Sequence, residues 1–263
     1  MSRESGQRLS LKDQIYTKED AHYFNELYED QLDWTRSTRK RLYRKMNLFH
    51  AKKVLEVGSG TGAILREIQT ISSRIRLVGI DWNLIALNYS KSESINPHLV
   101  CAKGELLPFS PNSFDITFSH YFLMWVKEPL TVLKEMKRVT RFGGWIACLA
   151  EPDYGGRIDY PVNELWEELL FESLSAPDPL IGRKLRALFS KVGLEVEVGL
   201  QTAVLSPNVV MDLYKAEIDK LTRFLPEKNK VNLKKIKHIL ETHLPTELFS
   251  FMPVFYAIAR KTK

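Results

Sequence analysis

A glycine-rich segment at residues 54–62, VLEVGSGTG, constrains the fold of this chain more than any other feature. An apolar strand is predicted over 53–57 and a helix over 62–71, with Gly58, Gly60 and Gly62 at the connection. Glycines permit a tight turn and let the backbone approach a ligand without a Cβ clash. The helix N-terminus beyond them presents unpaired N–H groups and a positive dipole end. The segment therefore predicts a strand, loop and helix that bind a small ligand.

Short apolar runs alternate with helical patterns through the middle of the chain. Strands are predicted over 53–57, 76–80, 98–102, 114–119 and 144–150, and helices over 62–71, 83–92 and 129–140. Such alternation is typical of βαβ units whose parallel sheet is covered on both faces. The expected fold class is α/β, with a doubly wound, mostly parallel, seven-stranded Rossmann-like sheet.

The remaining segments are expected to add to this sheet. Residues 18–49 are predicted to be helical, so 1–50 would form an N-terminal helical cap and 51–263 the ligand-binding domain. Further helices are predicted over 162–174 and 183–192, with a strand over 194–200. Two helices, 208–224 and 228–243, would form a helical insertion at 207–243 before a long last strand, 247–260. We expect that insertion to cap the ligand edge of the sheet.

Two acidic residues indicate the kind of ligand. Asp81 follows the second strand, 23 residues after Gly58, where an acid can accept hydrogen bonds from ribose hydroxyls. The pattern Gly58, Gly60, Ala63 also satisfies a dinucleotide fingerprint, so NAD is an alternative at this point. Glu56, however, precedes the glycines within the strand, where a carboxylate is awkward beside a pyrophosphate and useful near an ammonium or sulfonium group.

Four motifs in order, VLEVGSGTG, GIDWN, AKGELLPFSPNSFD and EMKRVTRFGGWIACLAEPD, resemble those of class I methyltransferases that depend on S-adenosylmethionine (SAM). The resemblance covers about residues 50–152 and is greatest to the small-molecule branch with ubiquinone- and menaquinone-type enzymes. It implies SAM as cofactor, S-adenosylhomocysteine as product, and methyl transfer by in-line displacement. The implied cofactor residues are Glu56, Gly58, Ser59, Gly60, Gly62, Asp81, Trp82, Gly104, Glu105, Leu106, Ser119 and His120.

The acceptor site is expected at the carboxyl ends of the fourth and fifth strands, since ligands of open α/β sheets bind there. The catalytic candidates are His120, Glu151, Asp153 and Tyr154, as base or orienting groups. The substrate-binding candidates are Tyr23, Trp34, Arg36, Tyr121 and Arg157, the last as an anion clamp.

The charge pattern leaves the acceptor open. The net charge is +6, and eight basic residues, but no acid, fall between 35 and 53. That stretch can attract phosphate or serve as a solvated helix face. A small-molecule acceptor is the leading hypothesis. The alternatives are methylation of a protein side chain or RNA, and a non-catalytic SAM-binding partner subunit.

Composition sets further expectations. No apolar run approaches the roughly 20 residues of a membrane span. No secretory signal or Cys/His cluster is visible, so a cytoplasmic protein without a metal site is expected, as a monomer or homodimer. Cys101 and Cys148, both in apolar strands, are expected to be reduced, buried thiols.

Overall fold

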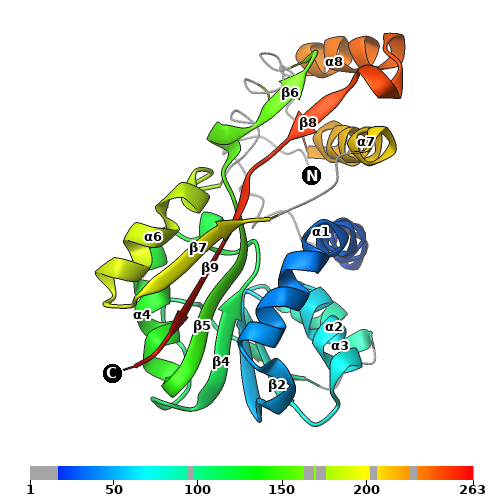
Figure 1. Ribbon diagram of the computed structural model, residues 1–263. Coiled ribbons are helices and arrows are strands. Elements are labelled where there is room, and N and C mark those ends of the chain that lie inside the picture. Colours follow the sequence, from blue (N-terminus) through cyan, green and yellow to red (C-terminus); the bar gives the residue numbers. More distant parts are fainter. Residues whose placement is uncertain are drawn as a thin grey trace.

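The computed structural model describes residues 17–93, 97–162, 169, 176–201, 206–224 and 230–262. A seven-stranded sheet has the order β3-β2-β1-β4-β5-β9-β7 (Figure 1). The strands are β1 (Lys53–Val57), β2 (Arg76–Asp81), β3 (His98–Cys101), β4 (Phe114–Ser119), β5 (Thr140–Pro152), β7 (Val196–Leu200) and β9 (Val254–Arg260). Strands β1 to β5 pair in parallel, and β9 runs antiparallel to β5 and β7. The predicted doubly wound, mostly parallel sheet is confirmed.

Helices cover both faces of this sheet (Figure 1). One face carries α1 (Lys18–Lys45), α2 (Ala63–Ile71) and α3 (Leu84–Ser92), and the other carries α4 (Pro129–Val139) and α6 (Ile181–Lys191). A capping box between Thr17 and Asp20 begins α1, and the Asn83 side chain accepts from two backbone N–H groups at the start of α3. The predicted helix over 162–174 lies almost wholly outside the described residues.

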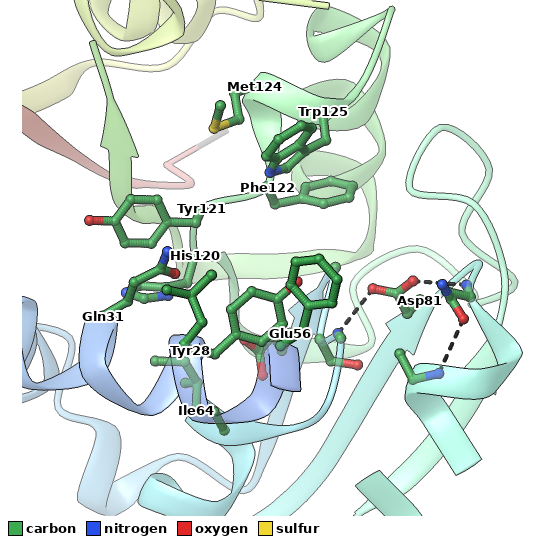
Figure 2. A pocket seen from close by; sticks show the side chains of 18 of the residues that line it. Tyr28, Gln31, Glu56, Ile64, Asp81, His120, Tyr121, Phe122, Met124 and Trp125 are labelled. Carbon is green, nitrogen blue, oxygen red and sulfur yellow. Dashed lines mark hydrogen bonds between the residues drawn. The ribbon is translucent and has the colours of Figure 1, made fainter. Parts of the chain in front are cut away.

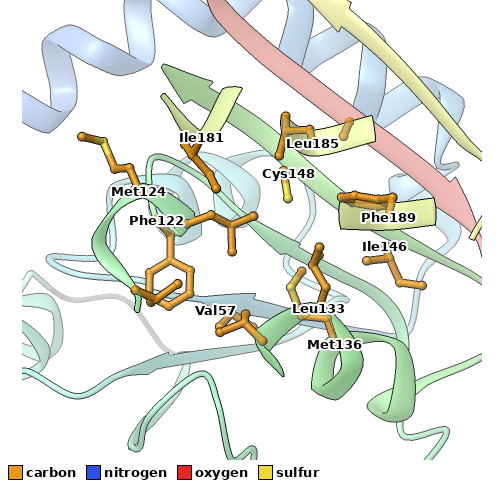
Figure 3. Close-up of a cluster of buried hydrophobic side chains, with 14 of the residues drawn as sticks. Val57, Phe122, Met124, Leu133, Met136, Ile146, Cys148, Ile181, Leu185 and Phe189 are labelled. Atoms are coloured by element: carbon orange, nitrogen blue, oxygen red, sulfur yellow. The ribbon is translucent and has the colours of Figure 1, made fainter. Parts of the chain in front are cut away.

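Strand alternation sorts the sheet's side chains into two cores. Leu55 and Val57 of β1 belong to the cluster beneath α4 and α6, where Leu133, Met136, Leu185 and Phe189 pack (Figure 3). Val54, one residue away, belongs to the second cluster with α1 and α2 side chains. Successive strand residues point to opposite faces, so Glu56 is directed to the α1 side with Val54. This alternation places an acidic side chain beneath the N-terminal helix.

The last predicted strand is interrupted, which corrects the expectation of one strand over 247–260. The structure has β8 (Phe249–Phe251), a break at Met252 and Pro253, and then β9. Proline has no N–H for a strand ladder, which accounts for the break. Strand β8 pairs with β6 (Ile158–Tyr160), a strand that is not among those predicted from the sequence. The two form a separate ribbon beyond the carboxyl edge of the main sheet (Figure 1).

The predicted insertion consists of α7 (Pro207–Phe224) and α8 (Lys230–Thr242), which lie beside the β6–β8 ribbon (Figure 1). A buried ionic cluster joins α7 to the ribbon. Arg157 donates to both oxygens of Asp159 and of Glu217, and the Tyr214 hydroxyl donates to Asp159 at 3.0 Å. The side chains of Arg157 and Asp159 are only 6% and 2% exposed. These ion pairs and hydrogen bonds therefore attach α7 of the insertion to the β6–β8 ribbon.

We expect Asp159→Ala to lower the free energy of unfolding by about 3 kcal/mol, because it leaves buried Arg157 and Tyr214 short of a partner. Denaturant unfolding measures the change. Asp33→Ala is the matched control, because Asp33 pairs with Arg36 on an exposed helix face and should cost less than about 1 kcal/mol. Equal losses for the two variants would contradict a stabilising role for the buried cluster.

The expectations for the two cysteines have different outcomes. Cys148 is buried, whereas Cys101 is exposed because β3 is an outer strand that pairs only with β2; the expectation for Cys101 was wrong. No helix in the described ranges is long and apolar enough to cross a bilayer. Among those same residues, no group of three or more His, Cys, Asp or Glu side chains is arranged to hold a metal ion.

Candidate functional site: the carboxyl ends of β1, β2 and β4

The strand order reverses beside β1, whose neighbours are β2 and β4. Loops leave the sheet in opposite directions at such a point and open a crevice at the carboxyl ends. Two adjoining cavities occupy this crevice. The first, here the α1 cavity, measures about 150 Å³ and lies between α1, the glycine loop and the end of β4. The second, here the loop cavity, measures about 430 Å³ and is lined by residues 102–105 and 125–127.

The glycine loop is held by β2. The N–H groups of Gly58 and Ser59 both donate to the carbonyl of Ile80, at 2.9 and 2.8 Å. Gly58 and Gly60 have φ values of +78° and +50°, the left-handed region that favours glycine. A Cβ on Gly60 would have only the Tyr28 ring nearby, at 3.5 Å, so this part of the loop faces open space beneath α1.

Asp81 lines both cavities and lies at one end of the α1 cavity (Figure 2). Its Oδ2 accepts from the N–H of Gly60 at 3.0 Å, and its Oδ1 from the N–H of Asn83 at 2.8 Å. These bonds fix the carboxylate at the end of β2. The predicted ribose acid thus lies on the wall shared by the two cavities.

Glu56 is the buried acid of the site. It lines the α1 cavity, is 2% exposed, and its Oε2 has no hydrogen-bond partner within the described parts of the chain. Burial raises the pKa of Glu56 well above its ordinary value, and Asp81 raises it further, whereas Arg39 and Arg66 lower it. A buried, unpaired carboxyl is costly to a fold unless a ligand satisfies it. Its position therefore fits a cationic group of a ligand.

Helix α1 forms the opposite wall of the α1 cavity. Its lining residues are spaced three or four apart and so share one helical face: Phe24, Leu27, Tyr28, Gln31 and Leu32. Burial raises the pKa of Tyr28, with a further contribution from the nearby Asp81, so the phenol stays protonated at neutral pH. The ion pair of Glu29 with Arg66, which donates to the Thr61 carbonyl, joins α1 to the glycine loop.

His120 and Tyr121 lie at the end of β4, at the far end of the α1 cavity from Asp81 (Figure 2). Their rings meet edge to face, with centroids 4.9 Å apart. Tyr121 has φ +49°, although it is not glycine, and its buried hydroxyl lacks a partner within the described chain. Such strain in a non-glycine residue clusters at functional sites. Burial lowers the pKa of His120 well below its ordinary value, and Arg39 lowers it further, so the imidazole is neutral at pH 7.

Phe122 separates the two cavities and lines both of them. Its ring lies against the glycine loop: a Cβ on Gly58 would meet ring carbon Cδ2 at 2.1 Å, and one on Gly104 would meet Cζ at 3.0 Å. Gly58 and Gly104 therefore make room for this ring. Trp125 continues the aromatic wall above it (Figure 2).

Most of the predicted cofactor residues come together in this crevice. Those that line a cavity are Glu56, Gly58, Ser59, Gly60, Asp81, Trp82, Gly104, Glu105 and His120. The other three are outside the cavity walls: Gly62 caps α2, Ser119 is buried at the end of β4, and Leu106 is 77% exposed.

The catalytic and substrate candidates are more dispersed. Tyr121 and Tyr154 line the α1 cavity with His120. Asp153 is bound to Arg183, and Arg157 to Asp159 and Glu217. Tyr23, Trp34 and the exposed Arg36 are on α1 but outside its cavity-lining face, and Arg36 pairs with Asp33.

Glu151 supports the wall of the site from behind. Its Oε1 accepts from the N–H groups of Phe122 and Leu123, at 3.2 and 2.9 Å, and it does not line either cavity. Burial raises the pKa of Glu151 to about 7, against the hydrogen bonds of the backbone at Leu123, Phe122 and Met124. These two hydrogen bonds hold the segment that carries Phe122 against the end of β5.

The cavity-facing residues of α1 were missed as site residues, although their spacing was visible in the sequence. Tyr28 and Gln31 recur with the apolar residues of a single helical face. Tyr23 and Trp34 were chosen for chemical type, and both are off that face. The helical period was therefore the better guide to the site than residue type.

Comparisons with known proteins agree with this geometry. Residues 55–148 match the family model described as a methyltransferase domain. The chain is 32% identical over 142 residues to a malonyl-[acyl-carrier protein] O-methyltransferase of Marinomonas sp., covering 52% of each chain. It is 31% identical over 150 residues to the demethylmenaquinone methyltransferase of Paenarthrobacter aurescens, covering 57% of this chain and 56% of that one. The chain thus spans about half the length of the curated relatives it matches.

Solved structures show the same fold at low identity. A methyltransferase of Haloferax volcanii, solved with the Trm112 activator, has a TM-score of 0.62 at 17% identity and covers 97% of this chain and 98% of that chain. A phosphoethanolamine N-methyltransferase of Haemonchus contortus, solved with SAM, has a TM-score of 0.61 at 15% identity, with 96% of this chain and 59% of that chain covered. Together these findings show that residues 55–148 resemble a methyltransferase domain and that the chain has the fold of the solved methyltransferases.

Proposed function

We propose that the chain transfers a methyl group from SAM to a small, uncharged acceptor bound in the α1 cavity. One observation carries the proposal. The buried carboxyl of Glu56, with an unpartnered oxygen, lies between the glycine loop and the α1 cavity. A buried carboxyl without a partner suits a ligand with positive charge, and SAM carries both an ammonium and a sulfonium group.

The residues present fit SAM in three ways. Glu56 would accept from the ammonium group, and Asp81 would accept from the ribose hydroxyls. The loop cavity, with Trp82, Gly104 and Glu105 on its walls, would take the adenine ring. Gly60 leaves room for the backbone to approach the ligand.

The bound sulfonium supplies an activated methyl group, and its leaving group departs neutral. The protein therefore has to orient the acceptor, exclude water and receive a proton. Helix α1 and the aromatic wall of Tyr121, Phe122 and Trp125 enclose the α1 cavity. Neutral His120 lies in the same cavity and can accept a proton there.

The cavity lining supports an uncharged, apolar acceptor. Of the described residues that line the α1 cavity, Glu56 and Asp81 are acidic, and none is Lys or Arg. The other walls are largely aromatic or aliphatic, including Phe24, Leu27 and Tyr154. With both acids assigned to SAM, the walls that remain for the acceptor are uncharged, so a free carboxylate or phosphate on the acceptor would have no cation to pair with in a low-dielectric site.

The alternatives have less support. A protein or RNA substrate was motivated by the basic stretch between residues 35 and 53. Five of its eight basic side chains have partners within the chain: Arg36 with Asp33, Arg39 with Glu67, Lys45 with Glu197, Arg41 over the Tyr256 ring and Lys53 over the Phe114 ring. A non-catalytic subunit would not require a neutral His120 in the acceptor cavity.

Asp81→Ala tests the donor site. We expect its SAM affinity, measured by calorimetry, to fall at least about 100-fold, because hydrogen bonds from two hydroxyls to a charged acceptor are worth roughly 1.5–3 kcal/mol each. Asp115→Ala is the matched control: Asp115 also accepts from two backbone N–H groups, Lys52 and Lys53, but at the opposite edge of the sheet. Unchanged SAM affinity in Asp81→Ala would refute the assignment.

A further inference from the structure

A buried hydroxyl on α1 contacts the histidine of the acceptor cavity. Thr35 is 1% exposed, and its Oγ1 lies 3.2 Å from His120 Nε2. The same oxygen lies 3.0 Å from the backbone carbonyl of Gln31 and accepts a hydrogen bond from Arg39 Nη1. Thr35 therefore has three polar neighbours around one oxygen.

Arg39 is itself fixed from two sides. Its Nη1 also donates to the Leu32 carbonyl at 2.7 Å, and Nε and Nη2 donate to the two oxygens of Glu67, both at 2.9 Å. The Tyr43 hydroxyl donates to Glu67 at 3.1 Å. Arg39 is 0% exposed, so this planar, bidentate pair is rigid as well as charged. Thr35 is thus held by the pairing of α1 with α2.

The hydrogen bonds of the Thr35 hydroxyl determine which ring nitrogen of His120 carries the proton. Thr35 has one hydroxyl proton, and both guanidinium and carbonyl neighbours have fixed roles, as donor and acceptor. At 3.0 Å the Gln31 carbonyl can only accept, so the Thr35 proton is directed to it. The contact with His120 is then a hydrogen bond only if Nε2 carries the proton. The other ring nitrogen, Nδ1, forms no hydrogen bond within the described residues and is left with a lone pair.

We infer that Thr35 and Arg39 are positioning residues that hold His120 as the Nε2–H tautomer, with Nδ1 as the proton acceptor for a substrate O–H or S–H group. The inference rests on the proposed methyl transfer and specifies its acceptor. A protic oxygen or sulfur requires a base, whereas an amine that is already neutral attacks without one.

The step balances as follows. The acceptor oxygen or sulfur forms a bond to the methyl carbon while the carbon–sulfur bond of the donor breaks, and that electron pair stays on the donor sulfur. The acceptor proton moves to Nδ1, which gives an imidazolium ion. The proton then leaves to solvent and restores neutral His120. The cation of Arg39 favours this return, because like charges in a buried site repel.

The surroundings of His120 set its pH response. The titratable and charged groups of its network and cavity are Arg39, Tyr28 and Tyr43 of α1, Glu67 of α2, Glu56 of β1, Asp81 of β2, Tyr121 beside it and Tyr154 after β5. Burial and Arg39 both lower its pKa. The rate of methyl transfer should therefore stay constant as the pH falls through about 6.5, the ordinary histidine value, and decrease only below it.

Nitrogen-15 NMR of the histidine rings in the full-length protein tests the tautomer without any substrate. Wild type should show His120 protonated at Nε2 and bare at Nδ1. Thr35→Val should lose this preference and lower the rate of methyl transfer at least tenfold with unchanged SAM affinity, and Thr35→Ser should restore both. Thr38→Val, a buried threonine one turn away without a bond to His120, is the control and should behave as wild type.

The outcomes separate the inference from the proposed function. A His120 protonated at Nδ1, or a tautomer unaffected by Thr35→Val, overturns the positioning role, whatever the activity. If the protein binds SAM but methylates only neutral amines, the protic acceptor is wrong although the tautomer stands. If no SAM binds, the proposed function fails while the tautomer measurement still decides the role of Thr35.

Discussion

Glu56→Gln is expected to weaken SAM binding about 30-fold or more and to remove most of the methyl transfer. The change keeps the size of the side chain and removes the carboxyl that lines the α1 cavity and would ionise beside the cationic ligand. Loss of one partner of a buried charge pair costs roughly 2–5 kcal/mol, and each 1.4 kcal/mol is a factor of about ten in affinity. Calorimetry with SAM measures the effect. Glu197→Gln, which changes an acid paired with Lys45 far from the site, is the control and should bind SAM normally.

The raised pKa of Glu56 adds a pH signature with a definite sign. In the free protein burial raises the pKa of this carboxyl well above its ordinary value, whereas in the unfolded chain it ionises near pH ~4.3. The stability that it contributes is therefore present below pH 4.3 and is lost as the pH rises toward the folded-state pKa. A cationic ligand binds the ionised form, so SAM affinity should increase with pH over the same range.

Glu56→Gln should abolish both effects and leave the free protein at least as stable as wild type at neutral pH. A variant that is stable and folded but does not bind SAM would assign the loss to the missing charge. A variant that binds SAM as tightly as wild type, with the same pH dependence, would mean that Glu56 does not face the donor.

Gly58→Ala is expected to unfold the glycine loop locally and to abolish SAM binding. Its φ of +78° disfavours any side chain, and a Cβ would lie 2.1 Å from the Phe122 ring. The backbone conformation costs about 1–2 kcal/mol and overpacking a further 1–3 kcal/mol. Chemical denaturation and calorimetry measure the two losses.

Two further variants separate the cost of the backbone conformation from the cost of the clash with Phe122. Gly143→Ala has nearly the same φ, +75°, but its nearest neighbour is an Arg260 nitrogen at 3.8 Å, so only the backbone cost of about 1–2 kcal/mol remains. Gly58→Ala combined with Phe122→Ala should regain part of the stability that the single change loses, since the ring is gone. If Gly58→Ala lowers the free energy of unfolding no more than Gly143→Ala does, the Phe122 ring does not lie against Gly58 as it does in the structure.

The sequence predicted the sheet, and the gathering of most candidate donor residues in one crevice, because these signals are local. Buried parallel strands appear as short apolar runs, and Gly58, Glu56 and Asp81 lie at fixed distances from them. Successive parallel strands have their carboxyl ends at the same edge of the sheet, so these residues were expected to lie close together.

The acceptor side depended on contacts that spacing does not reveal. Arg157 has the chemistry of an anion clamp, but Asp159 and Glu217, the latter 60 residues away, neutralise it. Arg39 belonged to an apparently free basic stretch, yet it is buried against Glu67 of α2. Burial and partner choice are tertiary properties, so residue type alone could not show that these side chains have partners within the chain.

Transfer of an isotopically labelled methyl group from SAM tests the central claim most directly. Purified full-length protein is incubated with labelled SAM and a cell extract that contains both small molecules and macromolecules, with Glu56→Gln as the blank. Label is expected in an uncharged small molecule, on oxygen or sulfur, with wild type only. Label in protein or RNA, or no transfer by a chain that binds SAM, would contradict it.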